Sequence, residues 1–168
     1  MQALSYCHYN LVDDTLTRMF DYFQACQFWT LACAAMRLTV DAQSKHVGLI
    51  SASPLSMGLL TRQGPPQWHP ATAELRAACA AAAELCTARG TDIAELAIQY
   101  AVRQESICTT LVGMCSREQV RRNVACAAAA FAQLDLRTTQ LLHDVAAVLA
   151  PVKNATWPSG LPENSVAL

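Results

Sequence analysis

The strongest candidate for chemistry in the residue pattern is a serine at the start of a predicted helix. Ser116 opens the segment 116–119, directly after an apolar run that predicts a strand. A helix start carries unpaired N–H groups and a partial positive charge, so it can bind a phosphate. Gly113, just before it, permits close approach of a ligand or simply makes a turn. An ordinary capping box, in which Ser116 caps the helix and Gln119 reaches back, is the commoner role of this pattern.

The other polar side chains form no recognisable catalytic set. Cys7 and His8 are neighbours on a predicted strand, which places them on opposite faces and argues against a nucleophile pair. His69 lies on a predicted loop, where a solvated histidine is more common than a binding residue. We expect His143 to face water from the last predicted helix. The acidic residues are scattered along the sequence, without a Ser-His-Asp order or a carboxylate pair.

The eight cysteines argue against a metal or disulfide framework, because no two of them have the C-x-x-C spacing. Cys79 and Cys86 are seven residues apart, on one face of an alanine-rich helix, where cysteine behaves as a small hydrophobe. We therefore expect buried, reduced thiols and no metal site. Reduced thiols indicate a reducing compartment, and we expect a cytoplasmic protein.

The composition predicts one globular domain over residues 1–168, with 53% hydrophobic and 15% charged residues. The formal net charge is −1 and there is no basic run, so nucleic acid and anionic membranes are not expected as partners. The first residues do not resemble a signal peptide. The longest apolar stretch, residues 28–36, is far shorter than the ~20 residues that a membrane helix needs.

Apolar periodicity and turn residues predict three strands that alternate with helices. The expected strands span 3–7, 46–51 and 107–112, and the expected helices span 13–24, 72–89, 92–101, 116–131 and 138–149. Gly90 is expected to end the second helix with a positive φ. The alternation predicts parallel pairing and an α/β fold.

Several longer sequence segments indicate the protein class more specifically than the spacing of single residues does. They read LSYCHY at 4–9, ISASPLSMGLLT at 50–61, QGPPQWHP at 63–70, LAIQYA at 96–101, LVGMCSREQ at 111–119 with Asn123, and LAPVKN at 149–154 with WPSG at 157–160. Together they resemble the aldo-keto reductase superfamily, and within it the plant L-galactose dehydrogenase branch. The resemblance implies the C-terminal part of a (β/α)₈ TIM barrel, with the sixth to eighth strands and an active site at their carboxyl ends.

The resemblance also implies a nicotinamide cofactor that is bound without a Rossmann fold. The implied contacts are Tyr6 near the nicotinamide, Ser53, Pro54, Leu55, Gly58 and Leu59 along the pyrophosphate, and Gly113, Met114, Ser116, Gln119 and Asn123 at the adenosine end. NADP-preferring relatives place a lysine near Gly113 and an arginine near Gln119. Both cations are missing, which favours NAD over NADP, although Arg117, Arg121 and Arg122 lie close by. Ala52 takes the place of the aromatic residue that many relatives stack on the nicotinamide.

By the same resemblance, the catalytic tyrosine, lysine, aspartate and histidine of the family belong to the first half of the barrel, before Met1. We therefore expect no catalytic residue here, and an edge strand without its fifth-strand neighbour. The implied parent reaction is NAD(P)-dependent oxidation of an aldose such as L-galactose to its lactone, with little turnover from this chain alone. Two alternatives remain: a nucleotide-binding or regulatory module, and half of a split oxidoreductase that pairs with an N-terminal half-barrel chain.

Residues 25–46 do not fit the family pattern, in which a short connection joins this helix to the next strand. The segment contains the apolar run at 28–36. It predicts either a helix added outside the barrel or translated non-coding sequence, including an aberrant splice. We expect it to be an atypical insertion in an otherwise continuous domain.

Overall fold

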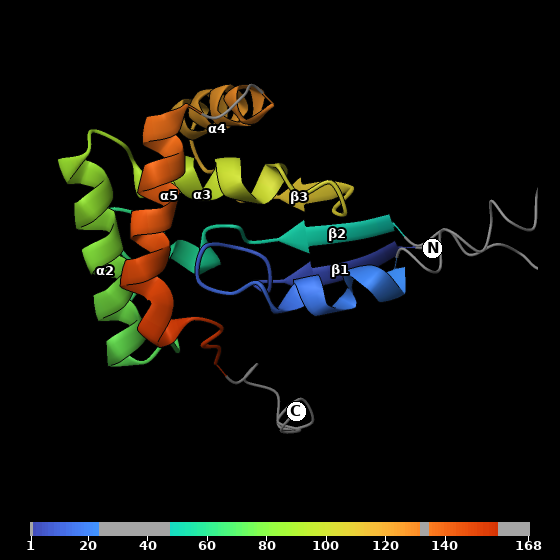
Figure 1. The fold of residues 1–168 in the computed structure, drawn as a ribbon, viewed down its shortest axis with the longest axis horizontal. Helices are drawn as coiled ribbons and strands as arrows, with labels where there is room; N and C mark the ends of the chain where they lie inside the picture. The colour runs from blue at the N-terminus through green and yellow to red at the C-terminus, as the bar shows by residue number, and fades with distance from the viewer. Residues whose placement is uncertain (1, 24–47, 132–134, 158–168) are drawn as a thin grey trace, which may run out of the picture.

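The computed structural model describes residues 2–23, 48–131 and 135–157, so the expected insertion at 25–46 lies outside the described residues. Its centre is a parallel sheet in the order β1-β2-β3, formed by Gln2–Tyr6, Gly48–Ala52 and Thr109–Leu111 (Figure 1). The register pairs Tyr6 with Ala52, and Ala52 with Leu111. The predicted α/β class and the parallel pairing are confirmed, and the sheet with its flanking helices forms a partial barrel.

The helices lie around and beyond this sheet. They are α2 (Ala73–Ala88), α3 (Ile93–Val102), α4 (Arg117–Ala130) and α5 (Leu136–Leu149), with short 3-10 helices η1 (Thr15–Met19), η2 (Ser56–Gly58) and η3 (Ala150–Val152). In Figure 1, α2 and α5 lie side by side beyond the carboxyl ends of β1 and β2. They therefore pack on the loops that leave the strands.

Local capping chemistry explains where these helices begin. The side chains of Thr72 and Asp92 accept hydrogen bonds from the backbone N–H groups of Leu75 (3.2 Å) and Ala94 (2.9 Å), as expected for N-caps. Gly90 ends α2 with φ 75°, as predicted. The predicted start of α5 at residue 138 is wrong by two residues. Asp135 is the cap, accepting from the N–H of Thr138 at 2.7 Å, and the helix begins at Leu136.

Other boundaries also differ from the prediction, for local reasons. The first helix begins as 3-10 rather than α-helix, because the Asp13 carboxylate accepts a hydrogen bond from the N–H of Thr15 (2.8 Å) and holds a tight turn. β1 ends at Tyr6 because Cys7 has a left-handed backbone, with φ 62°. β2 is shifted one residue beyond the predicted end, and β3 is shorter at both ends than the predicted strand.

The main core lies between the helices and the loops at the carboxyl ends of the strands. It contains Leu75, Cys79, Ala82 and Cys86 of α2, the face that the periodicity predicts. Ile93, Leu96 and Ala97 of α3, Val145 and Leu149 of α5, and Leu59 and Leu60 of the loop after β2 complete the cluster. Burying this apolar surface, at roughly 25 cal/mol per Å², is the main force that holds the helices against those loops.

One face of the sheet packs inside the protein, and the other is open. Leu49 of β2 packs with Tyr9, Leu16 and Phe20 in a second cluster on the covered face. On the opposite face, Leu4 is 60% exposed, and Tyr6 and Leu111 are about half exposed. Among the described strands, β1 pairs only with β2, as expected for a partial barrel with an open edge.

The cysteines differ in burial, and this generates the first prediction. Burial raises the pKa of Cys79 to about 12, and burial together with Asp92 raises the pKa of Cys86 to about 11. At pH 8 both should stay protonated and resist alkylation in the folded protein. The prediction of uniformly buried thiols is wrong for Cys108 and Cys115, which are exposed and should react quickly.

Alkylation with iodoacetamide followed by peptide mass mapping tests this difference in native buffer and in urea. All four sites should label in urea, which serves as the control for reagent access. Native labelling of Cys79 at the rate of Cys115 would contradict the buried core that α2 forms.

Candidate functional site

A pocket of about 500 Å³ opens where the three strands end. Tyr6, Ala52 and Leu111, which are paired in register across the sheet, line it together with the loops that follow β2 and β3. The lining residues from these loops are Ser53, Pro54, Leu55, Met57, Gly58, Val112 and Gly113. A hollow of about 660 Å³ lies between α2 and residues 59–65, but it does not reach the strand ends. Carboxyl ends of parallel strands are where α/β proteins usually bind ligands.

This pocket contains six of the residues that the sequence predicts for a cofactor site: Tyr6, Ser53, Pro54, Leu55, Gly58 and Gly113. The others lie away from it. Leu59 is 1% exposed and belongs to the core, so it supports the loop from behind. Met114, Ser116, Gln119 and Asn123 follow Gly113 into α4, on the exposed or half-exposed side of the connection.

Ser53 gives the loop after β2 its shape. Its backbone has φ 62°, while its N–H still donates to the carbonyl of Leu111 at 3.0 Å and so ties the end of β2 to β3. Its Oγ accepts a hydrogen bond from the N–H of Met57 at 3.0 Å. Ser56 and Met57 also have positive φ. Such strained residues gather at binding sites, where the surrounding structure holds them in place.

The same loop uses its own backbone N–H groups internally. The amides of residues 56 and 57 donate to the carbonyl and the Oγ of Ser53. The amides of residues 58 and 60 both donate to the Leu55 carbonyl, and the amide of residue 59 donates to the Ser56 carbonyl. A phosphate would therefore find side chains and apolar surface along this loop rather than a nest of free amides.

Gly58 is needed in this loop for two reasons. Its φ of 99° is disfavoured for other residues, and an added Cβ would lie 3.3 Å from the Cα of Pro65 and 3.4 Å from the Gly64 carbonyl oxygen. Gly113 is different, because an added Cβ there meets no atom within 4 Å. Glycine at this position leaves open space at the pocket rim.

The start of α4 confirms part of the predicted capping box. The Oγ of Ser116 accepts from the N–H of Gln119 at 3.2 Å, but Gln119 reaches back to the N–H of Cys115 (2.8 Å) rather than to that of Ser116. The first amides of the helix, those of Arg117 and Glu118, have no partner within the helix. They are the backbone donors that this end of the connection can offer to an anion.

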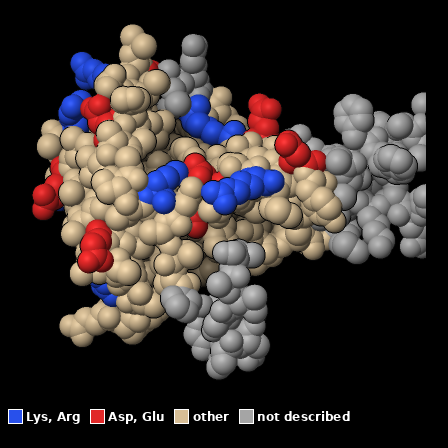
Figure 2. Space-filling model, turned by 60° about the horizontal axis from the view of Figure 1, so that its bottom comes forward, with Lys and Arg blue, Asp and Glu red and all other residues tan. Residues whose placement is uncertain are grey.

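Of the three arginines near the adenosine end, Arg122 is already engaged. Its guanidinium lies 2.8 Å from an Asp92 oxygen and 3.0 Å from a Glu95 oxygen, and these bonds raise its pKa. Arg117 and Arg121 are exposed. On the face that Figure 2 shows, Lys and Arg side chains lie among Asp and Glu side chains rather than in a single basic patch.

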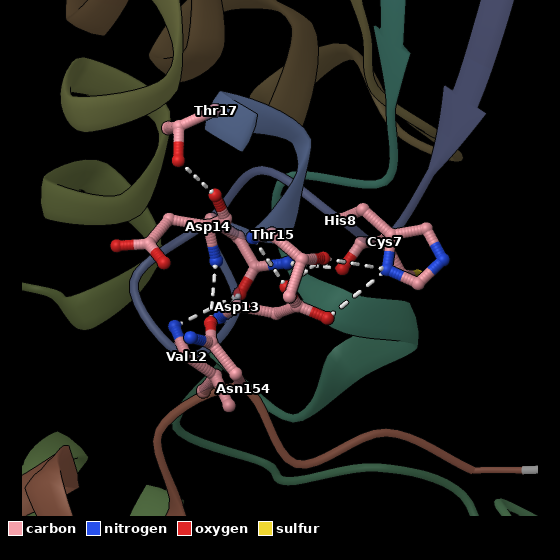
Figure 3. Close-up of polar contacts among 9 residues, drawn as sticks. Cys7, His8, Val12, Asp13, Asp14, Thr15, Thr17 and Asn154 are labelled. Atoms are coloured by element: carbon pink, nitrogen blue, oxygen red, sulfur yellow. Dashed lines mark hydrogen bonds and ion pairs between the residues drawn. The ribbon is translucent and has the colours of Figure 1, made fainter. Parts of the chain in front are cut away.

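A polar cluster after β1 was missed from the sequence. His8 Nδ1 lies 3.1 Å from Asp13 Oδ2, and Asp13 Oδ1 accepts hydrogen bonds from the Thr15 N–H (2.8 Å) and Oγ (2.6 Å) (Figure 3). The expectation that Cys7 and His8 share a strand is wrong, because the chain leaves the sheet at Cys7. The Asp-x-Thr spacing, which is typical of a side-chain-bonded turn, was the available signal.

The Cys7 thiol beside this cluster is poorly suited to act as a nucleophile. Burial raises its pKa, a hydrogen bond with the Ser53 side chain lowers it, and the Asp13 charge raises it further. The net direction is upward, so the reactive thiolate is disfavoured. The backbone amide of Cys7 instead connects the loop after β1 to the end of β2, by donating to the Ala52 carbonyl at 3.0 Å.

His69 is buried at 3% exposure, so the expectation of a solvated loop histidine is wrong. Its Nδ1 accepts from the N–H of Ala71 at 3.0 Å, and its Nε2 lies 3.3 Å from the carbonyl oxygen of Ser56. Its ring packs edge-on against Trp157 at 4.6 Å. Burial lowers its pKa, the Ser56 bond raises it, and Arg76 lowers it. His143 is exposed, as expected.

Two further properties bear on the kind of site. Within residues 2–23, 48–131 and 135–157, no three His, Cys, Asp or Glu side chains are grouped so that they could hold a metal ion. In the same ranges, no helix has the length and apolar character needed to cross a membrane.

The parallel sheet, the flanking helices and the pocket at the strand ends are those of a partial TIM barrel. The model of the aldo/keto reductase family matches residues 32–142. The chain belongs to the aldo/keto reductase family.

Individual relatives agree with this assignment. The chain is 45% identical over 161 residues to an L-galactose dehydrogenase of Arabidopsis thaliana, covering 96% of this chain and 44% of the relative. It is 34% identical over 102 residues to a D-arabinose 1-dehydrogenase of Saccharomyces cerevisiae, covering 61% of this chain and 25% of the relative. The chain thus spans less than half the length of these relatives.

A solved aldo-keto reductase from Bacillus halodurans, in its holo form, superposes with a TM-score of 0.55 at 20% identity. The match covers 94% of this chain and 45% of that structure. At this identity the match shows the fold, and the fold is that of a barrel to which this chain corresponds in part.

The buried histidine generates the second prediction. Because the folded protein lowers the pKa of His69, the unfolded chain binds a proton first as the pH falls below about 6.5. The stabilisation from neutral His69 is therefore complete above that pH and lost as the pH falls through the lower folded-state pKa. His69→Ala should lose about 2–3 kcal/mol of unfolding free energy at pH 8, since it leaves the Ser56 carbonyl and the Ala71 amide unbonded.

Urea unfolding at intervals from pH 8 to pH 5 measures both effects. His69→Ala should show a weaker loss of stability on acidification than the wild type. The matched control, His143→Ala, changes an exposed histidine and should keep the wild-type dependence. If the unfolding free energy of His69→Ala and of the wild type fell equally with decreasing pH, the proposal that folded His69 is neutral would be contradicted.

Proposed function

We propose that this chain is the cofactor-binding part of an NAD(P)-linked sugar oxidoreductase. The observation that carries the proposal is the pocket at the strand ends, where Tyr6, Ser53 and Gly113 come together from three separate segments. The likeness to sugar dehydrogenases supports the same class of substrate.

The pocket has features that fit a nicotinamide cofactor. Its volume of about 500 Å³ lies within the range of small-molecule sites, and its walls are largely apolar. Tyr6 lines the pocket, is about half exposed and can contact a planar ring. Ala52, beside it, leaves room where a larger side chain would fill the pocket. From there the connection through Gly113 leads to the start of α4, whose first amides suit an anionic group.

When bound, the nicotinamide would accept a hydride from the anomeric carbon of an aldose. The proton of the anomeric hydroxyl must then pass to a base as the lactone carbonyl forms. In the described part of the chain, Lys153 is paired with Asp14 at 2.9 Å, and no lysine lines the pocket beside Tyr6. We therefore propose that this chain binds the cofactor but turns over little or no sugar by itself. The proposed substrate class of the parent enzyme is aldoses such as L-galactose.

NAD is the proposed cofactor in preference to NADP. Gln119 stands where NADP-preferring relatives carry an arginine, and Arg122 is held by Asp92 and Glu95. A 2′-phosphate would therefore depend on Arg117 and Arg121 alone among the arginines of α4. The free thiols of the described cysteines support a reducing, cytoplasmic location.

The third prediction tests cofactor binding directly. Titration of the chain with NADH, followed by the cofactor fluorescence, should give saturable binding that is tighter than for NADPH. Gly113→Phe should weaken NADH binding at least about tenfold by filling the rim, whereas Gly113→Ala should change it less than about threefold. Gly113→Ala should unfold at the wild-type urea midpoint, because a Cβ at residue 113 meets no neighbour, and the urea midpoint of Gly113→Phe is measured to establish that this variant is folded.

The pair of variants separates blocking from unfolding. An unchanged affinity in folded Gly113→Phe would place the cofactor elsewhere. Absence of NADH and NADPH binding by the folded wild-type chain would refute the proposed function.

A second candidate function is supported by the open face of the sheet. On this face Leu4 of the edge strand β1 is 60% exposed and Tyr6 is 51% exposed. An exposed apolar side chain on an unpaired strand edge is typical of an interface. We infer that an N-terminal half-barrel chain could cover this face and supply the proton acceptor, making a split oxidoreductase.

The fourth prediction follows from this candidate. A mixture of the chain with a half-barrel chain that carries the family's tyrosine and lysine should form NADH from NAD and L-galactose. Leu4→Asp should abolish that activity by placing a charge in the interface, while leaving NADH binding by the chain alone unchanged. A mixture without NADH formation, or activity that survives Leu4→Asp, would contradict the split-enzyme candidate.

A further inference from the structure

A segment near the C-terminal end of the described chain is bonded to the loop that follows β1. The backbone N–H of Asn154 donates to the carbonyl of Val12 at 2.9 Å, and its side-chain Oδ1 accepts from the N–H of Asp14 at 3.0 Å (Figure 3). Lys153 adds an ion pair to Asp14 at 2.9 Å and a longer bond to the Leu11 carbonyl at 3.4 Å. We call residues 153–157 the strap and residues 7–14 the β1 loop.

The β1 loop is itself stiff, so a restraint at one point acts on the whole of it. Asn10 is fully buried; its Oδ1 accepts from the amides of Val12 (2.9 Å) and Asp13 (3.0 Å), and its Nδ2 donates to the Cys7 carbonyl (2.8 Å). The Asn10 amide donates to the carbonyl of Asp13 at 2.7 Å. Residues 7 to 13 thus form one hydrogen-bonded unit.

This unit is joined to the pocket at its other end. The amide of Cys7 donates to the carbonyl of Ala52 at 3.0 Å, and Ala52 directly precedes Ser53 in the chain. Tyr6, Ala52 and Ser53 all line the pocket. A continuous set of bonds therefore runs from Asn154 through the β1 loop to the residues that shape the pocket.

At its far end, the strap also contacts the loop after β2. The ring of Trp157 packs against His69, whose Nε2 lies 3.3 Å from the Ser56 carbonyl oxygen. Ser56 precedes Met57 and Gly58, which line the pocket. The strap thus holds both loops that leave the central strands.

We propose that Asn154 is a positioning residue for the pocket: by holding the β1 loop, it keeps Ser53 in its binding geometry. The inference rests on the proposed cofactor-binding function, and it names a residue that does not itself line the pocket. Asparagine suits the position, because the backbone there has φ 62°, which asparagine tolerates better than most residues. Its amide oxygen then supplies the bond to Asp14 that glycine could not.

The fifth prediction compares two substitutions at this residue in the full chain. Asn154→Gly keeps the positive φ and the bond to Val12 but removes the side-chain bond, so the urea midpoint should change little. The Kd for NADH should nevertheless rise about threefold to tenfold, and amide exchange at Asp14 and Ser53 should accelerate. Asn154→Ala loses the same bond and adds backbone strain, so it should show a similar Kd with a lower midpoint.

The matched control is Lys153→Met, which removes a partly exposed ion pair and should change the Kd less than about twofold. The amides of α2 serve as the internal reference for exchange. An unchanged Kd in Asn154→Gly would overturn the proposal, and so would unchanged exchange at Ser53.

The proposed function can fail separately from this inference. If the folded wild-type chain binds neither NADH nor NADPH, the proposed function is wrong. In that case the amide exchange rates of Ser53 and Met57 in Asn154→Gly test the positioning role of Asn154. Faster exchange than in the wild type supports that role, and unchanged exchange overturns it.

Discussion

The site depends on the turn that Ser53 makes at the end of β2. A positive φ at a residue other than glycine costs on the order of 1–3 kcal/mol, so it persists only where the surroundings enforce it. Here the Ser53 amide bonds to Leu111 and its hydroxyl accepts from Met57, while the Cys7 amide donates to the carbonyl of the preceding residue, Ala52. Residues 52 and 53 thereby connect the ends of all three strands. The direction in which Pro54 and Leu55 leave the sheet follows from this turn.

The sheet is covered on one face and open on the other, and the pocket lies on the open side. Tyr9, Leu16 and Phe20 pack against Leu49 on the covered face, while Tyr6 and Leu111 remain about half exposed beside the pocket. A closed barrel would turn this open face inward. The chain can therefore carry one wall of a binding site without enclosing it, and its core beyond the strand ends does not require the missing wall.

The proposed division between binding and chemistry follows from that geometry. Residues that bind a long cofactor can lie along the ends of neighbouring strands, where the pocket-lining residues from Tyr6 to Gly113 lie. A proton acceptor must instead be held in reacting geometry opposite the bound ring. The proposal that this chain binds the cofactor and performs little chemistry rests on that difference. The exposed apolar side chains of β1 mark where a second wall could pack.

Sequence reasoning succeeded where local chemistry decides the outcome. The starts of α2 and α3 were predicted to within one residue, and the alanine-rich face of α2 was predicted correctly, because each depends on residues within one or two turns. The start of α5 was missed because Asp135 and Thr138 are both capable of capping, and only the three-dimensional structure chooses between them. His69 was missed for a different reason: its burial depends on Ser56 and Trp157, which are distant in the sequence. The cofactor residues remain a prediction from resemblance, of which six line one pocket, whereas the bonds that hold them were invisible in the pattern.

The proposed preference for NAD is linked to the packing of α3 against α4. Asp92 does two things at once: its Oδ1 accepts from the Ala94 amide and caps α3, and its Oδ2 binds Arg122 of α4. Releasing Arg122 toward a 2′-phosphate would break that bond and the one to Glu95, and the helix contact would weaken with it. Discrimination against the extra phosphate therefore does not require a repulsive group at the adenosine end. The carboxylates that join the two helices already bind Arg122, which leaves Arg117 and Arg121 as the arginines of α4 that a 2′-phosphate could reach.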